Sequence, residues 1–126
     1  MKEPIWLQKN VVIAFHEMLL VEHGGLAGMR EEGLLDSALG RPIHQYYYDS
    51  VSDIFDLAST YAMGIIQNHP FIDGNKRTGF VSMKTFLARN GLWLKLPKED
   101  AIKTFISLAD GKVSHSHLSE WIKRHL

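Results

Sequence analysis

The sequence NHPFIDGNKRTG, residues 68–79, joins two long stretches of helical periodicity. Pro70 disfavours helical geometry at the residue before it, so the first helix should end at or just past His69. Gly74 then allows a tight turn, and a second helix should begin near Asn75. The segment therefore predicts a corner at which one helix ends and another begins, and the fold can be built outward from it.

The two helices beside this corner have the clearest periodicity in the chain. Between residues 50 and 69, Ser50 and Asp53 can cap the start, and apolar side chains recur at helical spacing: Ile54, Leu57, Ala58, Tyr61 and Ile65. From about residue 75 to Asn90 a second helix is predicted, which Gly91 ends and whose buried positions are Phe80, Met83 and Leu87. The first of the two is expected to be the central helix.

The remaining patterns are also mostly helical. Helices are predicted around Val12, Phe15 and Leu19, over a short stretch from Leu34 to Leu39, and at two C-terminal stretches marked by Ile102, Phe105, Ile106 and Ala109 and by Leu118, Trp121, Ile122 and His125. Extended structure is indicated at 92–97 and at 43–51, and we expect residues 40–50 to form a loop or a short hairpin. The sequence thus predicts one all-α domain over residues 1–126.

The composition excludes several classes of protein. The 126 residues are 45% hydrophobic, which suits one domain with its own core, and acidic and basic residues balance at 14 each. That balance disfavours binding to nucleic acid through its phosphates. The chain has no cysteine, its longest apolar run is too short to span a bilayer, and its start lacks a signal-peptide pattern. We therefore expect a cytoplasmic protein with no nucleic-acid or membrane partner.

Two cations stand in the first turn of the helix that follows the corner. Lys76 and Arg77 lie where the helix dipole is already positive, a placement that costs roughly 0.3–1 kcal/mol per exposed charge. Backbone N–H groups at a helix start also lack intrahelical acceptors and attract anions. The charges are explained if Gly74, Asn75, Lys76 and Arg77 bind phosphate, with Gly74 allowing close approach to the backbone. The corner is therefore predicted to be a phosphate-binding site.

Two further side chains give the corner a chemistry. Asp73 could cap the helix or pair with the cations, and beside phosphates it could also hold Mg²⁺, which prefers one or two carboxylates, water and phosphate oxygens. His69 is the nearby side chain that can accept a proton near neutral pH. A base, a metal-binding carboxylate and a phosphate site together suit transfer from a nucleoside triphosphate to a hydroxyl group.

The same residues resemble the signature of the Fic/Doc family. The sequence HPFIDGNKR follows its pattern of His, any residue, Phe, any residue, Asp or Glu, Gly or Ala, Asn, Gly or Lys, and Arg. Upstream, GGLAGMREEGLLDSALGRP and the helix after it resemble the order of elements in Doc-type (death-on-curing) toxins, so the resemblance covers about residues 11–91. It implies a compact helical bundle with a short flap segment. Tyr46, Tyr47 and Tyr48 fall where such a flap aligns a target, with packing in the core or on the surface as an equal alternative.

The resemblance also implies an activity. Family members transfer part of a nucleotide to a protein hydroxyl, and most resemble adenylyltransferases, with Gly in place of Lys76 and a second Arg in place of Phe80. Both departures resemble the Doc branch, whose members are kinases that phosphorylate a threonine of translation elongation factor Tu. We therefore expect a Doc-like toxin in which His69 is the catalytic base, Asp73 holds Mg²⁺ and ATP or another triphosphate is the co-substrate. The alternatives are a Fic-type adenylyltransferase and a helical binding module that has lost activity.

Regulation is implied by the same resemblance. Doc-type toxins are neutralised by a small antitoxin whose C-terminal segment packs along the toxin, so we expect such a partner and an exposed apolar groove that receives it. Other Fic proteins carry an inhibitory helix with the pattern Ser/Thr-x-x-x-Glu-Gly/Asn, but here Ser116–Glu120 is followed by Trp121, and we do not expect it to inhibit. No metal site is predicted at His115, His117 and His125, which have no acidic or cysteine partner at ligand spacing.

Overall fold

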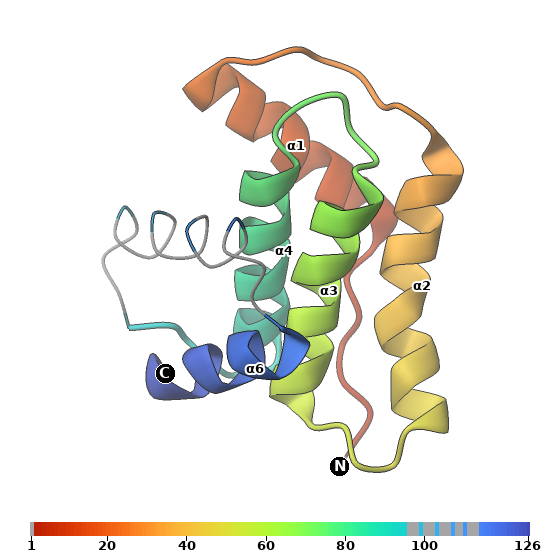
Figure 1. Ribbon diagram of the computed structural model, residues 1–126, viewed down its shortest axis with the longest axis vertical. Helices are drawn as coiled ribbons and strands as arrows, with labels where there is room; N and C mark the ends of the chain where they lie inside the picture. Colours follow the sequence, from red (N-terminus) through yellow and green to blue (C-terminus); the bar gives the residue numbers. More distant parts are fainter. Residues whose placement is uncertain (1, 96–98, 100–102, 104–106, 108–109, 111–113) are drawn as a thin grey trace.

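The computed structural model describes residues 2–95, 99, 103, 107, 110 and 114–126. Within this part of the chain the secondary structure is helical, with one isolated β-bridge and no named strand. The helices in chain order are α1 (Lys9–His23), α2 (Glu32–Tyr48), α3 (Ile54–Asn68), α4 (Asn75–Arg89) and α6 (His115–Arg124). The predicted all-α fold is confirmed (Figure 1).

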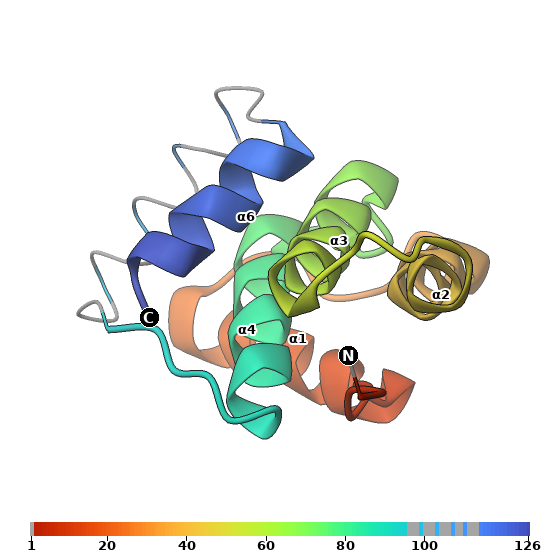
Figure 2. The ribbon, with the colours of Figure 1, turned by 90° about the horizontal axis from the view of Figure 1, so that it is seen from below.

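Helix α3 lies at the centre of the bundle. Figure 2 shows α3 between α2 and α6, with α4 along another side and α1 packed on α4. The buried side chains of α3 include the apolar stripe expected from the sequence, Leu57, Ala58, Tyr61 and Ile65. Because each fully buried Leu or Ile side chain stabilises a fold by about 1.5–3 kcal/mol, the helices that share this stripe are held together through α3.

Glycines set the spacing of α3 from its neighbours. A Cβ atom at Gly79 of α4 would lie 3.1 Å from the Ala62 carbonyl oxygen of α3, and one at Gly64 of α3 would lie 3.4 Å from the backbone of Ala38 in α2. A glycine inside a helix costs roughly 0.5–1 kcal/mol relative to alanine, so the chain gives up helix propensity for close approach. The end of α3 and the start of α4, which carry the predicted site, are held at this close spacing.

Helix α2 is longer than the sequence predicted. The helix expected at 34–39 is present but extends further at both ends, and the loop or hairpin expected at 40–50 is wrong over residues 40–48, because one helix continues to Tyr48. The buried residues of α2 follow helical spacing: Leu35, Ala38, Leu39 and Pro42. A proline inside a helix removes one hydrogen bond and costs about 3 kcal/mol in isolation. Here Pro42 completes the apolar stripe that packs on α3, and the burial of that stripe offsets the cost.

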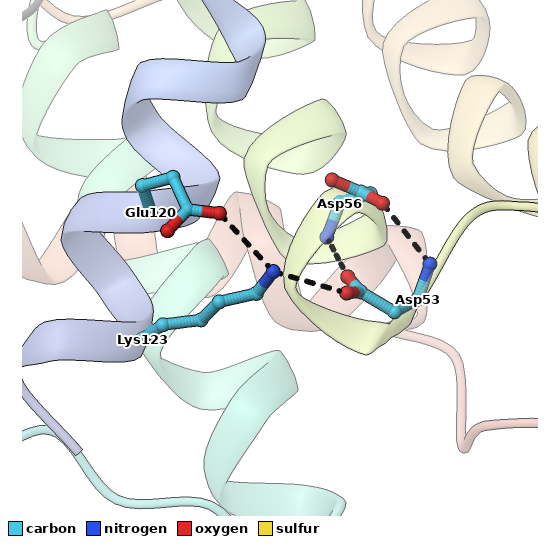
Figure 3. A network of polar contacts seen from close by, with 4 residues as sticks. All are labelled: Asp53, Asp56, Glu120 and Lys123. Atoms are coloured by element: carbon cyan, nitrogen blue, oxygen red, sulfur yellow. Dashed lines mark hydrogen bonds and ion pairs between the residues drawn. The ribbon is translucent and has the colours of Figure 1, made fainter.

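A polar network fixes α6 to the start of α3 (Figure 3). The predicted cap is Asp53, whose side chain accepts a hydrogen bond from Asp56 N–H, while the Asp56 side chain accepts one from Asp53 N–H. Lys123 Nζ of α6 lies 3.3 Å from both Asp53 Oδ2 and Glu120 Oε1. Burial acts to raise the pKa of Asp53, but the hydrogen bonds from Asp56 and the charge of Lys123 outweigh it, so that the pKa is lowered.

The N-terminal segment is anchored on α3 and the end of α4. The Tyr61 hydroxyl accepts a hydrogen bond of 3.1 Å from Leu7 N–H, and the Asn90 side chain bonds both backbone groups of Ile5. Burial raises the pKa of Tyr61 to about 12, so the phenol remains neutral well above its usual range. Tyr61 therefore serves both as a core side chain and as a polar anchor.

The C-terminal third was expected to contain two helices and an extended stretch. The last helix is confirmed as α6, whereas the helix expected from Ile102, Phe105, Ile106 and Ala109 lies outside the described residues. The extended stretch expected at 92–97 is not a strand over residues 92–95, which the structure describes. Among the helices of the described residues, none combines the length and the apolar character needed to cross a membrane.

Candidate active site

The predicted site comprises residues of the α3–α4 loop, residues 69–74, and of the first turn of α4, at the end of the bundle over which the α1–α2 connection passes (Figure 1). The connection pairs with this loop in antiparallel fashion. Arg30 N–H donates to Pro70 O at 2.7 Å, and Ile72 N–H donates to Gly28 O at 3.0 Å. Residues 28–30 therefore form the extended segment beside the loop.

Asn75 ties the same loop to the start of α4. Its Oδ1 accepts a hydrogen bond from Phe71 N–H at 3.0 Å, and its Nδ2 donates to Phe71 O at 2.9 Å. Asn75 is 4% exposed and Phe71 is 1% exposed, so water has little access to either bond. The sequence predicts Asn75 as a phosphate ligand. Because its side-chain amide is occupied by Phe71, the group it can offer an anion is its backbone N–H at the helix start.

A buried histidine that the sequence analysis did not single out supports the loop from α1. His16 is 3% exposed, and its Nε2 lies 2.8 Å from Asp73 O. A carbonyl oxygen only accepts hydrogen bonds, so Nε2 must carry the hydrogen. The imidazole also stacks on Phe71, with 3.8 Å between ring centroids and 9° between planes. The available signal in the sequence was a histidine on the apolar face of α1, at helical spacing from Val12 and Leu19.

His69 ends α3 with its backbone in the left-handed region, at φ 52°. This conformation is uncommon for a residue with a side chain, and it turns the chain out of α3 while His69 N–H still donates to Ile65 O at 3.1 Å. The side chain is exposed and lines a cavity. Its imidazole makes no hydrogen bond to the part of the chain that the structure describes. A ring nitrogen of His69 is therefore available to accept a hydrogen bond from a bound group.

The Asp73 carboxylate is held by two backbone N–H groups. Its Oδ1 accepts from Gly74 at 2.9 Å and its Oδ2 from Leu26 at 3.2 Å. Each oxygen keeps a lone pair, and the side chain is exposed, so the carboxylate can still bind a cation. Asp73 thus fits a Mg²⁺ ion that takes its other ligands from phosphate and water. Among the described residues, no group of three or more His, Asp or Glu side chains could hold a metal by itself.

The two cations of the first turn of α4 have different surroundings. Lys76 forms an ion pair with Asp110, in which the side chains are 44% and 55% exposed. An exposed pair of this kind contributes about 0–1 kcal/mol, so a more highly charged anion can replace Asp110. Arg77 Nε is buried and has no hydrogen-bond partner among the described residues. An unpaired buried donor is costly, so Nε is a polar group that the fold leaves unsatisfied, while the Arg77 side chain brings positive charge to the helix start.

One cavity brings all the predicted site residues together. Its volume is about 380 Å³, and it is lined by Ile66 together with His69, Asp73, Gly74, Asn75, Lys76 and Arg77. A smaller cavity of about 210 Å³ lies on the α1 side of the loop and shares Asp73, Gly74 and Arg77 with the first. A larger cavity, of about 570 Å³, extends along α2, α3 and the start of α6. Tyr48 lines it, but none of the residues predicted for catalysis, phosphate binding or metal binding does. We therefore take the 380 Å³ cavity as the candidate active site.

The three tyrosines that the sequence placed near a flap lie at the other end of the bundle. Residues 46–48 end α2 beside the start of α3, whereas His69 follows the end of α3, about 22 Å away along a helix of 15 residues. Tyr46 packs edge-on against Trp6 with 5.7 Å between ring centroids, and the Tyr47 hydroxyl donates to Glu3. Of the two alternatives left open for these tyrosines, target contact at a flap and packing, the structure agrees with packing, because α2 continues through them.

The bundle, the loop and its cavity define a member of a known family. The family described as Fic/DOC matches residues 6–87, a span that contains α1 to α3, the α3–α4 loop and most of α4. The protein belongs to the Fic/DOC family, as the sequence HPFIDGNKR indicated.

Two curated relatives carry the name Doc. The protein is 33% identical over 113 residues to "Protein kinase doc" of Escherichia phage P1, an alignment that covers 90% of this chain and 89% of that protein. It is 37% identical over 75 residues to "Toxin Doc" of Mycolicibacterium smegmatis, which covers 59% of this chain and 58% of that protein. This similarity agrees with the two departures of the sequence from the adenylyltransferase pattern, Lys76 and Phe80.

Proposed function

We propose that this protein is a Doc-like toxin that transfers the γ-phosphoryl group of a nucleoside triphosphate to a hydroxyl group of a protein. The observation that carries the proposal is the 380 Å³ cavity. An exposed imidazole, a carboxylate, the cations Lys76 and Arg77 and a helix start line it together. The relative named as a protein kinase supports the choice of reaction.

The start of α4 is the proposed site for the phosphates. Its first backbone N–H groups lack intrahelical acceptors and can donate to phosphate oxygens, and Arg77, which lines the same cavity, adds positive charge there. Lys76 can exchange the Asp110 carboxylate for a phosphate because their ion pair is exposed and weak. The long side chain of Lys76 would block the position that the α- and β-phosphates take in the adenylyltransferases of this fold. It would favour a nucleotide bound in the reverse direction, with its γ-phosphate toward the acceptor hydroxyl.

His69 is the proposed general base. The acceptor hydroxyl oxygen attacks the γ-phosphorus, the bond from that phosphorus to the β–γ bridging oxygen breaks, and the nucleoside diphosphate leaves. The hydroxyl proton passes to a ring nitrogen of His69, which lines the cavity beside Asp73. Asp73 would hold Mg²⁺, which when bound neutralises charge on the phosphates. Gly74, at φ 80°, lets the backbone approach the nucleotide closely.

The proposed target is a threonine of translation elongation factor Tu, and the proposed regulator is a small antitoxin protein. The relative named as a toxin supports a toxin–antitoxin system. An apolar groove of about 340 Å³ between α1 and α4 suits a helical antitoxin segment. Two of its lining side chains, Met18 and Trp93, are largely exposed and would be buried by such a segment.

The position of a label in the nucleotide tests the reaction. The purified protein is incubated with elongation factor Tu, Mg²⁺ and ATP that is labelled either on the γ-phosphate or on the adenine. We expect label on the elongation factor from γ-labelled ATP alone. Label transferred from adenine-labelled ATP instead would establish adenylyl transfer and refute the kinase proposal. Transfer from neither nucleotide would favour a binding module.

Two histidine variants connect the activity to the cavity. His69→Ala should abolish transfer and should remove toxicity when the protein is expressed without an antitoxin. His117→Ala changes an exposed histidine in α6, at a position outside the 380 Å³ cavity, and should leave both properties intact. Both variants should keep the helical circular dichroism of the wild type because neither side chain lies in the core. Toxicity that survives His69→Ala would mean that catalysis at this cavity is not the source of the effect.

A further inference from the structure

The α3–α4 loop is supported from three directions. Residues 28–30 pair with its backbone, Asn75 bonds both backbone groups of Phe71, and His16 reaches it from α1. His16 differs from the other two because it touches the part of the loop that carries Asp73 and Gly74. It lies 57 residues before Asp73 and does not line the 380 Å³ cavity.

We propose that His16 is a positioning residue for the transfer reaction, an inference that rests on the proposed function. Its Nε2–H bond to Asp73 O fixes the peptide group between Asp73 and Gly74. The carboxylate of Asp73 and the backbone N–H of Gly74 both depend on the orientation of that region. His16 thereby sets where the cation-binding carboxylate and the start of the anion site lie, although it contacts neither ligand.

Packing gives the Asp73 side of the loop little other support. A cavity of about 210 Å³ separates the end of α1 from the loop and is lined by His16, Asp73, Gly74 and Arg77, among others. Side-chain contacts that would otherwise immobilise this stretch are missing where such a space exists. The side chains of Ile72 and Asp73 are themselves exposed. Leu26 N–H bonds the Asp73 carboxylate, whereas His16 bonds the Asp73 backbone across this space.

The stack on Phe71 holds the imidazole in its donating orientation. The two rings are nearly parallel, at 9°, with centroids 3.8 Å apart, and Phe71 is in turn fixed by both bonds from Asn75. The ring of His16 therefore has a rigid surface on one side. Through His16, the position of the buried Phe71 therefore determines the position of the exposed Asp73.

The function assigned to His16 requires a donor and not a charge. Both the neutral ring with hydrogen on Nε2 and the imidazolium donate from that nitrogen. Glutamine is of comparable length and can donate from its amide, whereas methionine, of nearly the same length, cannot. His16→Gln and His16→Met both lose the ring stack, so the two variants differ in the hydrogen bond to Asp73 O.

The experiment compares these two variants with the wild type. Steady-state transfer from γ-labelled ATP to elongation factor Tu gives kcat and KM, and amide hydrogen exchange reports the order of residues 69–77 without need of activity. We expect His16→Met to lower kcat/KM at least tenfold and to speed exchange in the loop, because small displacements of reacting groups have large kinetic effects. His16→Gln should stay within about threefold of the wild type in both measurements.

The outcomes separate this inference from the proposed function. Equal kinetics and equal loop exchange in the Met and Gln variants would overturn the positioning role, while transfer by the wild type would leave the proposed function standing. A wild type that transfers no label would refute the proposed function. In that case faster loop exchange in His16→Met than in His16→Gln would still establish that His16 orders the loop, and equal exchange would refute it. Circular dichroism confirms that each variant is folded before the comparison.

Discussion

Replacing Asn75 with alanine should destabilise the protein by about 2–4 kcal/mol, even though Asn75 lies in the predicted ligand site. The change removes the acceptor for Phe71 N–H at 3.0 Å and the donor to Phe71 O at 2.9 Å. Both residues are almost fully buried, so the two backbone groups are left without partners. Each such group costs about 1–3 kcal/mol, and the carbonyl lies at the lower end because an unsatisfied acceptor is better tolerated than an unsatisfied N–H.

Urea denaturation followed by circular dichroism measures this loss. With an m-value of roughly 2 kcal/mol per molar urea for a domain of this size, the midpoint should fall by about 1–2 M. The matched control is Lys76→Met, which changes the next residue of the same helical turn. Lys76 makes an exposed ion pair with Asp110, so its loss should change stability by less than about 1 kcal/mol.

Equal stability of the two variants would refute the reasoning. If Asn75→Ala unfolded at the same urea concentration as Lys76→Met, with an unchanged m-value, the Asn75 amide would not be what holds Phe71. Asn75 would then have to be regarded as a ligand for the nucleotide, and the loop would have to derive its order from His16 and residues 28–30.

Three further changes test other contacts. Tyr61→Phe should lower the free energy of unfolding by about 1–2 kcal/mol. Because burial raises the folded-state pKa of Tyr61 to about 12, the wild type should lose more stability than the variant as the pH rises above about 10. Thermal melts of both proteins over this pH range measure the difference. Gly25→Ala would place a Cβ 2.8 Å from Asp73 Oδ2 at a φ of 123°, and should reduce the rate of label transfer at least tenfold. Asp53→Ala should lower the free energy of unfolding by about 0.5–2 kcal/mol at neutral pH through loss of the α3 cap. Because the folded-state pKa of Asp53 is lowered, the difference in stability between wild type and variant should shrink as the pH falls below about 4, as urea titrations would show.

Local signals were sufficient to predict the two helices that carry the site. Asp53 caps α3, Pro70 follows its end, and Gly74 precedes α4, so the boundaries depended on residues next to one another in the chain. The predicted site residues all lie within residues 69–77, and one cavity contains them for the same reason. What the sequence could not predict was how the two cations differ, because Asp110 is 34 residues from Lys76.

The errors have a common physical cause in contacts between distant segments. Gly40 and Pro42 favour the end of a helix locally, and only the burial of the α2 stripe against α3 keeps that helix intact to Tyr48. His16 escaped notice because its partner is a backbone oxygen, which has no counterpart in the residue pattern. The pairing of residues 28–30 with the loop likewise uses backbone groups, so no side-chain periodicity marks it.

The tight contact between Gly79 and the Ala62 carbonyl suggests how such a protein could become inactive during evolution without any change to the residues around its cavity. A single added methyl group at Gly79 would act as a spacer and push α4 away from α3. His69 follows one of these helices and the proposed phosphate-binding residues begin the other, so the distance between the proposed proton acceptor and the proposed nucleotide site would increase. A displacement of about 1 Å can cost on the order of a hundredfold in rate. A homologue with this change would therefore keep HPFIDGNKR unaltered and yet lack the proposed transfer activity.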